Sequence, residues 1–513
     1  MRVAMMSDFF YPRLGGVENH ILNLSKELKK LGHTVIIITN ANTGVSGVRY
    51  VDGFKVYYLE LFTLFGGSVF PTVLCSSMPI VELLLAEEIE IVHGHQCSTM
   101  AIEGIFHSRL LGIPTCFTNH SLVKIESLGG VVTSSTFRMS IRESKGIICV
   151  SGATRDNTAD RLGIDGYNIR VIPNAVTEEF KPSNEPLEWI PSDEAAENNE
   201  VKRLNSDGMM KGRKSGSSLI KDGGVDGSTD GSIKSRVVEN EKIDENVRTT
   251  AGTTNLRNES VIVEDNEVNS ATTESVRGAE DLIIISVVSR LTARRGAGLL
   301  ADVLPSICRM DDRIRIVIAG DGEKKELLEQ TVEKYHLKGR VKFLGGVHPS
   351  EVKNILNRSN LFLNTSLTDA FCISIIEASA CGLYVVSTDV DGISEVLPGD
   401  MITLVPPTAE GIVSGIKASI PKISAYNRKL SHARVHSMYK WSLVAKETDT
   451  VYRDIFRESA KASLRDRLKL SIKRIYRTEK DRLSFLFKFL LVINYAIIFI
   501  SAVQYENKRR HRQ

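Results

Sequence analysis

Short apolar runs alternate with segments of helical period along most of this chain, and that alternation constrains the fold more than any other feature. Residues 2–7 are predicted to form a buried strand, and a helix beginning near Val17 gathers its apolar residues on one face. Gly32 ends this helix, and Thr34–Thr39 forms the next strand. Such strand–helix–strand units build parallel sheets covered by helices. The pattern therefore predicts an α/β protein.

The alternation continues to Pro173 and restarts at Asp281, which predicts two Rossmann-like, doubly wound domains. Further strands are expected at Ile89–Val92, Thr115–Thr118, Gly146–Val150, Ile169–Ile172, Leu282–Val288, Arg313–Ala319, Val341–Leu344, Asn360–Leu363 and Leu383–Ser387. In such sheets the ligand binds at the carboxyl ends of the strands. We therefore place the first domain at residues 1–182 and the second at 281–440.

Residues 183–280 break the pattern, because they are rich in Ser, Asn, Asp, Glu, Gly, Lys and Arg and poor in aromatic residues. A segment of this composition buries too little apolar surface to offset the entropy of ordering it. We predict a disordered polar insertion between the domains. A regulatory segment and a tolerated surface insertion are the two interpretations of it.

Composition excludes some classes of protein. The net charge of +3 over 513 residues gives no signal for nucleic-acid binding. Seven cysteines, an odd number without a Cys-x-x-Cys pair, indicate reduced thiols rather than a disulfide framework. The amino-terminal residues lead directly into a strand and show no secretory signal.

The carboxyl-terminal part differs from the rest. Residues 441–483 are predicted to be helical and basic, with an apolar ridge (Leu464, Leu468, Ile472, Ile475) that suits either an anionic membrane surface or a solvated helix. Phe485–Val503 is an apolar run of 19 residues, interrupted by Lys488 and Asn494. This length is just enough to span a bilayer, and a buried or interfacial helix is the alternative. Basic residues before the run place the main body on the cytosolic side.

The segment Asn364–Gly382 carries the clearest chemistry. A strand enters a polar loop in which Thr368 or Asp369 can cap the following helix, leaving the N–H groups of Ala370, Phe371 and Cys372 free to bind an anion. If the segment is mostly helical, the carboxylates of Asp369 and Glu377 lie about 10 Å apart. This spacing suits a nucleotide-sugar, with its pyrophosphate between two hydroxyl-binding carboxylates. An ordinary strand–loop–helix with an acidic cap is the alternative.

Other candidate residues also follow strands. Gly15 and Gly16 occupy the first strand-to-helix turn, where backbone can approach a phosphate. Arg290 and Arg295 follow the first strand of the second domain and can neutralise a departing diphosphate. His120 follows a strand of the first domain. His93 and His95 end another, and without a third ligand nearby we interpret them as cleft-lining or core residues rather than a metal pair.

Together these motifs resemble those of the retaining glycosyltransferases of family 4. The resemblance rests on Ser7–Glu18, the Ser289–Gly296 loop, Ile172–Val176 and the Asn364–Gly382 segment, whose family pattern is Glu-x7-Glu. Asp369 stands where that pattern has Glu, Arg295 where it has Lys, and Thr177 where it has Asp. The resemblance implies a GT-B fold, in which two Rossmann-like domains face a cleft.

The family also implies the role of each residue. His120, Arg290, Arg295 and Asp369 are the expected catalytic residues, with His120 facing the donor sugar. The expected donor-binding residues are Gly15, Gly16, Gly322, Gly346, Val347, Ala370, Phe371, Cys372 and Glu377, the last at the ribose. Asp389-Val-Asp391 falls in a family loop that leads to Glu395, so we do not interpret it as a metal motif. No metal and no other cofactor is expected.

Within family 4, residues 1–182 and 281–440 most resemble the members that transfer N-acetylglucosamine from UDP-GlcNAc to phosphatidylinositol, the first step of glycosylphosphatidylinositol-anchor synthesis. This resemblance implies partner subunits and the endoplasmic reticulum membrane, with cytosolic catalytic domains and one membrane helix. Two alternatives stay open: a family 4 transferase with another donor or lipid acceptor, and an inactive scaffold. No residue is assigned to the acceptor.

Overall fold

A computed structural model describes residues 1–460 except 14, 42–43, 62–76, 123–136, 139, 143 and 184–281. The predicted insertion, apart from Ser183, lies outside the described residues, as do the apolar ridge after residue 460 and the run Phe485–Val503. Within the described part of the chain, no helix combines the length and apolar character needed to cross a bilayer.

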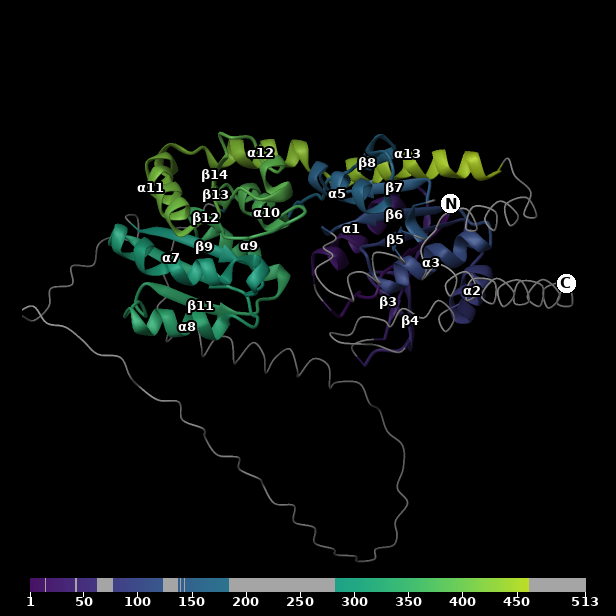
Figure 1. The fold of residues 1–513 in the computed structure, drawn as a ribbon, viewed down its shortest axis with the longest axis horizontal. Coiled ribbons are helices and arrows are strands. Elements are labelled where there is room, and N and C mark those ends of the chain that lie inside the picture. Colours follow the sequence, from purple (N-terminus) through teal and green to yellow (C-terminus); the bar gives the residue numbers. More distant parts are fainter. Residues whose placement is uncertain are drawn as a thin grey trace, which may run out of the picture. The chain divides into compact units, whose positions relative to one another are not determined.

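The first sheet has eight strands in the order β3-β4-β2-β1-β5-β6-β7-β8. All neighbours pair in parallel except β3 and β4, which form an antiparallel hairpin. Its strands are β1 (Arg2–Met6), β2 (Thr34–Asn40), β3 (Gly47–Val51), β4 (Phe54–Leu59), β5 (Ile91–His95), β6 (Thr115–Asn119), β7 (Gly146–Cys149) and β8 (Ile169–Val171). Helices α1 (Gly16–Lys30), α2 (Ser77–Ala86), α3 (Thr99–Leu110) and α5 (Gly152–Leu162) connect or cover them (Figure 1).

The second sheet has six parallel strands in the order β11-β10-β9-β12-β13-β14. They are β9 (Ile283–Val288), β10 (Ile314–Ala319), β11 (Val341–Gly345), β12 (Leu361–Asn364), β13 (Tyr384–Thr388) and β14 (Ile402–Val405). The helices of this domain are α7 (Ala297–Met310), α8 (Lys325–Lys334), α9 (Pro349–Asn357), α10 (Ile373–Ala380), α11 (Ala409–Ala425) and α12 (Arg428–Met438) (Figure 1). This order is that of a doubly wound sheet.

Helix α13 (Trp441–Ala460) follows the second domain in sequence but packs against α1 and against strands β6 and β7 of the first. Its buried Tyr452 hydroxyl lies 2.7 Å from Nδ1 of His93 on β5. The first domain is therefore completed by a helix that comes more than 250 residues after β8, which only a tertiary contact can reveal.

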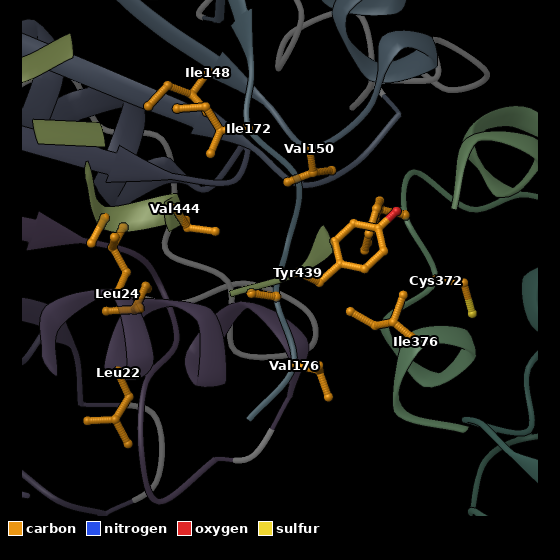
Figure 2. Packing of buried hydrophobic residues seen from close by; sticks show 14 of the residues in the cluster. Leu22, Leu24, Ile148, Val150, Ile172, Val176, Cys372, Ile376, Tyr439 and Val444 are labelled. Carbon is orange, nitrogen blue, oxygen red and sulfur yellow. The ribbon is translucent and has the colours of Figure 1, made fainter. Parts of the chain in front are cut away.

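A single apolar cluster includes residues of both domains. It extends from Leu24 and Val444 to Val150, Tyr439 and Ile376 (Figure 2). Tyr439 is buried, stacks edge-on against Phe371 with ring centroids 5.6 Å apart, and donates its hydroxyl hydrogen to the carbonyl of Val396 at 2.6 Å. Burial of apolar surface is the main favourable contribution to such packing, and the single polar group of the tyrosine has a partner.

The eleven strands predicted from sequence are confirmed, with ends that differ by up to three residues. The β3–β4 hairpin and β14 were not predicted. Asp52 and Gly53 join β3 to β4 with φ values of 49° and 77°, the left-handed conformation that an Asp-Gly hairpin turn adopts. The Asp-Gly signal was present, but β3 is exposed and Arg49 interrupts its short apolar pattern, so it lacks the apolar run that marks a buried strand. Six cysteines lie in the described residues, and all six are free thiols.

Candidate active site

The second sheet has its topological switch point between β9 and β12, where the strand order reverses. Crevices at such points, outside the carboxyl ends of the strands, are where doubly wound sheets bind ligands. Arg290 and Arg295 follow β9, and Asp369 and Glu377 follow β12. The fold therefore brings the predicted cations and carboxylates to the same crevice.

The two loops that line this crevice are bonded to each other. Leu367 donates its N–H to the carbonyl of Arg294 at 3.0 Å, and the Thr365 hydroxyl donates to the carbonyl of Arg295 at 3.3 Å. Gly296 has φ 68°, and a Cβ there would lie 1.7 Å from the Thr365 carbonyl oxygen. Glycine is therefore required for the loops to meet, and their close approach fixes the arginines relative to the carboxylates.

Arg295 forms an ion pair with Asp369. Asp369 is buried, and its backbone N–H donates to Asp391 Oδ2 at 3.2 Å. Burial lowers the pKa of the Arg295 guanidinium, and the neighbouring Arg290 and Arg294 add to this effect. The Asp369 carboxylate thus compensates one of the two positive charges that we assign to the pyrophosphate. Arg290 is exposed.

Helix α10 begins later than predicted. Its first residue is Ile373, and its cap residue Cys372 forms no side-chain capping bond, so the expected cap by Thr368 or Asp369 is wrong. Ala370, Phe371 and Cys372 lie in the buried loop before the helix. Asp369 instead pairs with Arg295, which removes it from the helix end. Between Asp369 and Glu377, the residues from Ile373 onward are helical and those before it are not, so only part of the segment is the helix that the 10 Å estimate assumed.

The helix end still suits an anion. No acidic side chain occupies the first turn of α10, and its amide N–H groups carry the positive end of the helix dipole. A Cβ added to Gly16 would lie 3.3 Å from Cδ1 of Ile373, so the first glycine turn faces this helix end. Gly15 precedes α1 and is its cap residue, without a side-chain bond. The two predicted phosphate-binding elements therefore lie against each other.

Glu377 lies one turn into α10 and is half-buried. Burial raises the pKa of its carboxyl to about 7, and the negative charge of Glu179 adds to the shift. A carboxylate in this position accepts hydroxyl hydrogen bonds well once it is ionised, because its own protein environment leaves it poorly compensated.

The predicted nucleotide loops end the neighbouring strands β10 and β11. Gly322 has φ 154°, and a Cβ there would lie 2.5 Å from the Leu291 carbonyl oxygen, so this glycine allows the β10 loop to pack on the β9 loop. A Cβ on Gly346 would lie 3.7 Å from Cβ of Asp321, which places the β11 loop beside the β10 loop. Gly346 is exposed and Val347 is half-buried. The three loops therefore pack side by side, and Gly322 has a packing reason that needs no ligand.

The first sheet has its own switch point between β1 and β5. His120 follows β6, the strand next to β5, and its Nε2 lies 3.2 Å from Nδ1 of His95. His20, in the second turn of α1, packs edge-on against His120 with ring centroids 4.5 Å apart. Sequence reasoning missed His20, because a histidine inside an amphipathic helix carries no local signal of a site.

Four histidines, His20, His93, His95 and His120, lie together in this region. His93 is fully buried, and its nitrogens lie 2.7 Å from the Tyr452 hydroxyl and 2.7 Å from the Thr118 hydroxyl, as expected of a core residue. Burial lowers the pKa of His93 to about 3 and that of His20 to about 4. Burial and the neighbouring histidines hold the pKa values of His95 and His120 well below the ordinary value. All four rings are therefore neutral at pH 7.

Family models match both halves of the chain: Glycosyltransferase Family 4 matches residues 14–180, and Glycosyl transferases group 1 matches residues 271–420. Three curated relatives carry one function in their names, since each is named as a subunit of phosphatidylinositol N-acetylglucosaminyltransferase. The relative from Arabidopsis thaliana is 35% identical over 88% of this chain and 81% of its own length. The human relative is 32% identical over 88% of this chain and 75% of its own length. The GPI3 subunit of Saccharomyces cerevisiae (strain YJM789) is 31% identical over 97% and 92%.

The chain belongs to the PIG-A/GPI3 family of phosphatidylinositol N-acetylglucosaminyltransferase subunits. It is a glycosyltransferase, as the family models and the names of these relatives agree. The relatives are named as subunits, so members of this family act within larger transferases.

Solved structures show the same fold. Sucrose-phosphate synthase of Thermosynechococcus elongatus superposes with a TM-score of 0.59 at 15% identity, covering 89% of this chain and 99% of that one. Anabaena HepE, solved with UDP and glucose, superposes with a TM-score of 0.56 at 15% identity, covering 88% and 99%. The predicted GT-B fold with two Rossmann-like domains is confirmed.

Proposed function

We propose that this member of the PIG-A/GPI3 family transfers N-acetylglucosamine from UDP-GlcNAc to phosphatidylinositol, the first step of glycosylphosphatidylinositol-anchor synthesis. One observation carries the proposal. Relatives from a plant, an animal and a yeast, each more than 30% identical over most of this chain, all have this transferase in their names. The crevice supports it with the charges that a nucleotide-sugar requires.

Each group at the crevice has a part in binding the donor. Arg290 and Arg295 contact the pyrophosphate together with the amino-terminal N–H groups of α10. The ionised Glu377 accepts the two ribose hydroxyls, and the backbone around Gly346 and Val347 contacts the base. Because Arg295 is paired with Asp369, an arriving diphosphate takes over this arginine and frees Asp369 to accept a sugar hydroxyl.

The transfer itself replaces one bond at the sugar C1 with another on the same face. The bond from C1 to the β-phosphate oxygen breaks, and a bond forms from C1 to an inositol oxygen. The departing phosphate accepts the proton of the inositol hydroxyl, so the atoms and charges balance without an enzyme nucleophile. Arg290 and Arg295 stabilise the negative charge that develops on UDP. Neutral His120 orients the sugar by hydrogen bonding, and no metal takes part in these steps.

We further propose that the enzyme works within a complex in the endoplasmic reticulum membrane, with its catalytic domains in the cytosol. Phosphatidylinositol stays in the bilayer, so a transferase that uses it must work at the membrane surface. The apolar run Phe485–Val503 has the length of one span, and basic residues precede it.

Product analysis tests the function. Membranes holding the full-length chain and its partner subunits are incubated with radiolabelled UDP-GlcNAc and phosphatidylinositol, and the labelled lipid is identified by mass spectrometry. We expect N-acetylglucosaminyl-phosphatidylinositol, with turnover at least a hundredfold lower in Arg290→Ala. Lys417→Ala, exposed on α11, is the matched control. A different sugar or lipid in the product would refute the substrate assignment. Absence of any product in membranes where the chain binds its partners would indicate a scaffold.

A further inference from the structure

Three imidazole rings from separate elements converge in the first domain: His20 of α1, His95 at the end of β5 and His120 after β6. Each offers one nitrogen, and these three nitrogens all lie within 4.8 Å of one another. His20 and His95 are buried and His120 is half-buried. The cluster lies at the switch point between β1 and β5, where a doubly wound sheet binds ligands.

A hydrogen bond holds the His20 ring with a lone pair available. His20 Nδ1 lies 2.8 Å from Oδ1 of the buried Asn174. Because this amide oxygen only accepts, Nδ1 carries the hydrogen and Nε2 is left with its lone pair. Histidines that bind metals show this arrangement, in which the other ring nitrogen donates to an oxygen that fixes the tautomer. The indole of Trp441 packs edge-on against the same ring, with centroids 5.2 Å apart.

His95 is supported from its other side. Its Nε2 lies 3.3 Å from Sδ of Met5, a weak acceptor, so Nδ1 is the nitrogen that faces the cluster. His93 packs on the ring with centroids 4.1 Å apart. Both nitrogens of His93 are used by Tyr452 and Thr118, so His93 supports the cluster and adds no ligand.

The spacing is close to that of a metal site. Zinc–nitrogen bonds of about 2.0–2.1 Å in a tetrahedral site place the ligand nitrogens about 3.3 Å apart. His95 Nδ1 and His120 Nε2 are already 3.2 Å apart. The other nitrogen–nitrogen separations reach at most 4.8 Å. Ring rotations that shorten such a separation by about 1.5 Å therefore complete the site. Three protein ligands with a fourth position left to water or another molecule are typical of zinc sites that accept an exogenous ligand.

We propose that His20, His95 and His120 form a binding site for a divalent transition-metal ion of the Zn²⁺ class. Neutral imidazoles select Zn²⁺, Co²⁺, Ni²⁺ and Cu²⁺ over Mg²⁺ and Ca²⁺. The metal is not needed for transfer. It binds His120, the residue that otherwise faces the donor sugar, so it inhibits the enzyme by competing with the sugar and leaves the uridine diphosphate site open. This competition rests on the proposed function, whereas the metal site itself does not.

Direct binding gives the first test and needs no assumption about the substrates. The full-length chain, purified with its partner subunits and treated with a chelator, is titrated with Co²⁺ and then with Zn²⁺. We expect the visible absorption bands of a tetrahedral Co²⁺ site, saturation at one ion per chain, and loss of the bands when Zn²⁺ displaces Co²⁺. His20→Gln and His95→Gln should each weaken Zn²⁺ binding tenfold or more.

His432→Gln is the matched control. His432 and His436 are neighbouring histidines on α12, outside the cluster, with ring centroids 4.4 Å apart. Zn²⁺ affinity should be unchanged in this variant. Thermal unfolding of each variant without metal identifies a folding defect. A similar loss of Zn²⁺ affinity in His20→Gln and in His95→Gln means that the conclusion does not depend on one substitution.

Inhibition is the second test. Added Zn²⁺ should raise the KM for UDP-GlcNAc without changing kcat, should be reversed by EDTA, and should leave the Kd of UDP unchanged. Each variant is compared with its own metal-free rate, and His20→Gln should require at least ten times more Zn²⁺ for half-inhibition. Equal Zn²⁺ affinity in folded His20→Gln and the unaltered protein would overturn the site. Zn²⁺ that binds at the cluster but displaces UDP, or that raises kcat, would overturn the proposed competition with the sugar.

Discussion

Glu377 should make donor binding depend on pH near neutrality. Its carboxyl has a pKa of about 7, because burial raises it and Glu179 adds to the shift. Only the ionised carboxylate accepts both ribose hydroxyls, since one oxygen of a protonated carboxyl carries a hydrogen and acts as a donor. The ionised fraction falls from about nine-tenths at pH 8 to about one-tenth at pH 6. The Kd of UDP-GlcNAc should therefore rise about tenfold over this interval.

Substituting Glu377→Gln keeps the size of the side chain and removes the charge. Two charge-assisted hydrogen bonds contribute about 1.5 kcal/mol each at the low end, so their loss weakens donor binding by about 3 kcal/mol, or roughly a hundredfold. The Kd of this variant should also be independent of pH between 6 and 8. Glu410→Gln, exposed at the start of α11, is the control and should behave like the unaltered protein.

Isothermal titration calorimetry with UDP-GlcNAc measures how the Kd depends on pH, and no other group involved in binding changes its ionisation between pH 6 and 8. Both phosphates of the sugar nucleotide are diesters that stay ionised, whereas the terminal phosphate of UDP titrates near pH 6. The buried histidines do not interfere either, because the pKa of His20 is about 4 and that of His120 is well below its ordinary value. Binding at pH 7 should release protons, seen by comparing buffers of different ionisation enthalpy. A flat Kd from pH 6 to 8, or the same pH dependence in Glu377→Gln, would refute the reasoning.

Three further predictions concern other parts of the molecule. Glu377→Gln should raise the Tm of the ligand-free protein above pH 7 and lose this advantage below about pH 4.5. Because the pKa of Glu377 is raised in the folded state, ionising this carboxyl lowers the free energy of unfolding. The loss is complete above the folded-state pKa and absent below the unfolded-state pKa. Deleting residues 190–275 should leave folding and basal transfer intact, because polar composition predicts no core there and loop-closure entropy changes slowly with length; insoluble protein would contradict this. Truncation after residue 460 should leave the Kd of UDP-GlcNAc unchanged but greatly reduce transfer to phosphatidylinositol in bilayers, and short-chain phosphatidylinositol should partly restore it; equal rates on bilayers would disprove the tether.

Sequence reasoning succeeds where a feature is local. The alternation of strands and helices fixes which residues end each parallel strand, and those ends meet at one edge of a sheet whatever the packing details. Arg295 and Asp369, which follow the neighbouring strands β9 and β12, form an ion pair for this reason. The two switch points follow from strand order, which the family resemblance supplied and periodicity alone does not.

Sequence reasoning fails where a feature depends on contacts between distant residues. The ring of His20 becomes part of a site only through Asn174, 154 positions away, and through Trp441 on a helix that returns from the far end of the chain. The start of α10 was misplaced because Asp369 has the chemistry of a cap, yet Arg295 competes for the same carboxylate. An ion pair in a partly buried site is stronger than a hydrogen bond to a helix end, so the tertiary partner determines where Asp369 lies.

This ion pair also connects two of the three departures from the family pattern. The pattern places Lys at position 295 and Glu at position 369, whereas this chain has Arg and Asp. Asp is one methylene shorter than Glu, and the Arg fork reaches farther than an ammonium and binds through several N–H groups. Since the two residues pair with each other, the longer cation compensates for the shorter carboxylate.

A double-mutant cycle tests this coupling. Arg295→Lys leaves a gap between the two charges, and Asp369→Glu crowds them. Each substitution alone should therefore lower transfer about tenfold or more. The double variant restores the family pair and should recover most of the activity. Additive losses in the double variant would show that the two positions act independently and that the ion pair has no part in arranging the donor site.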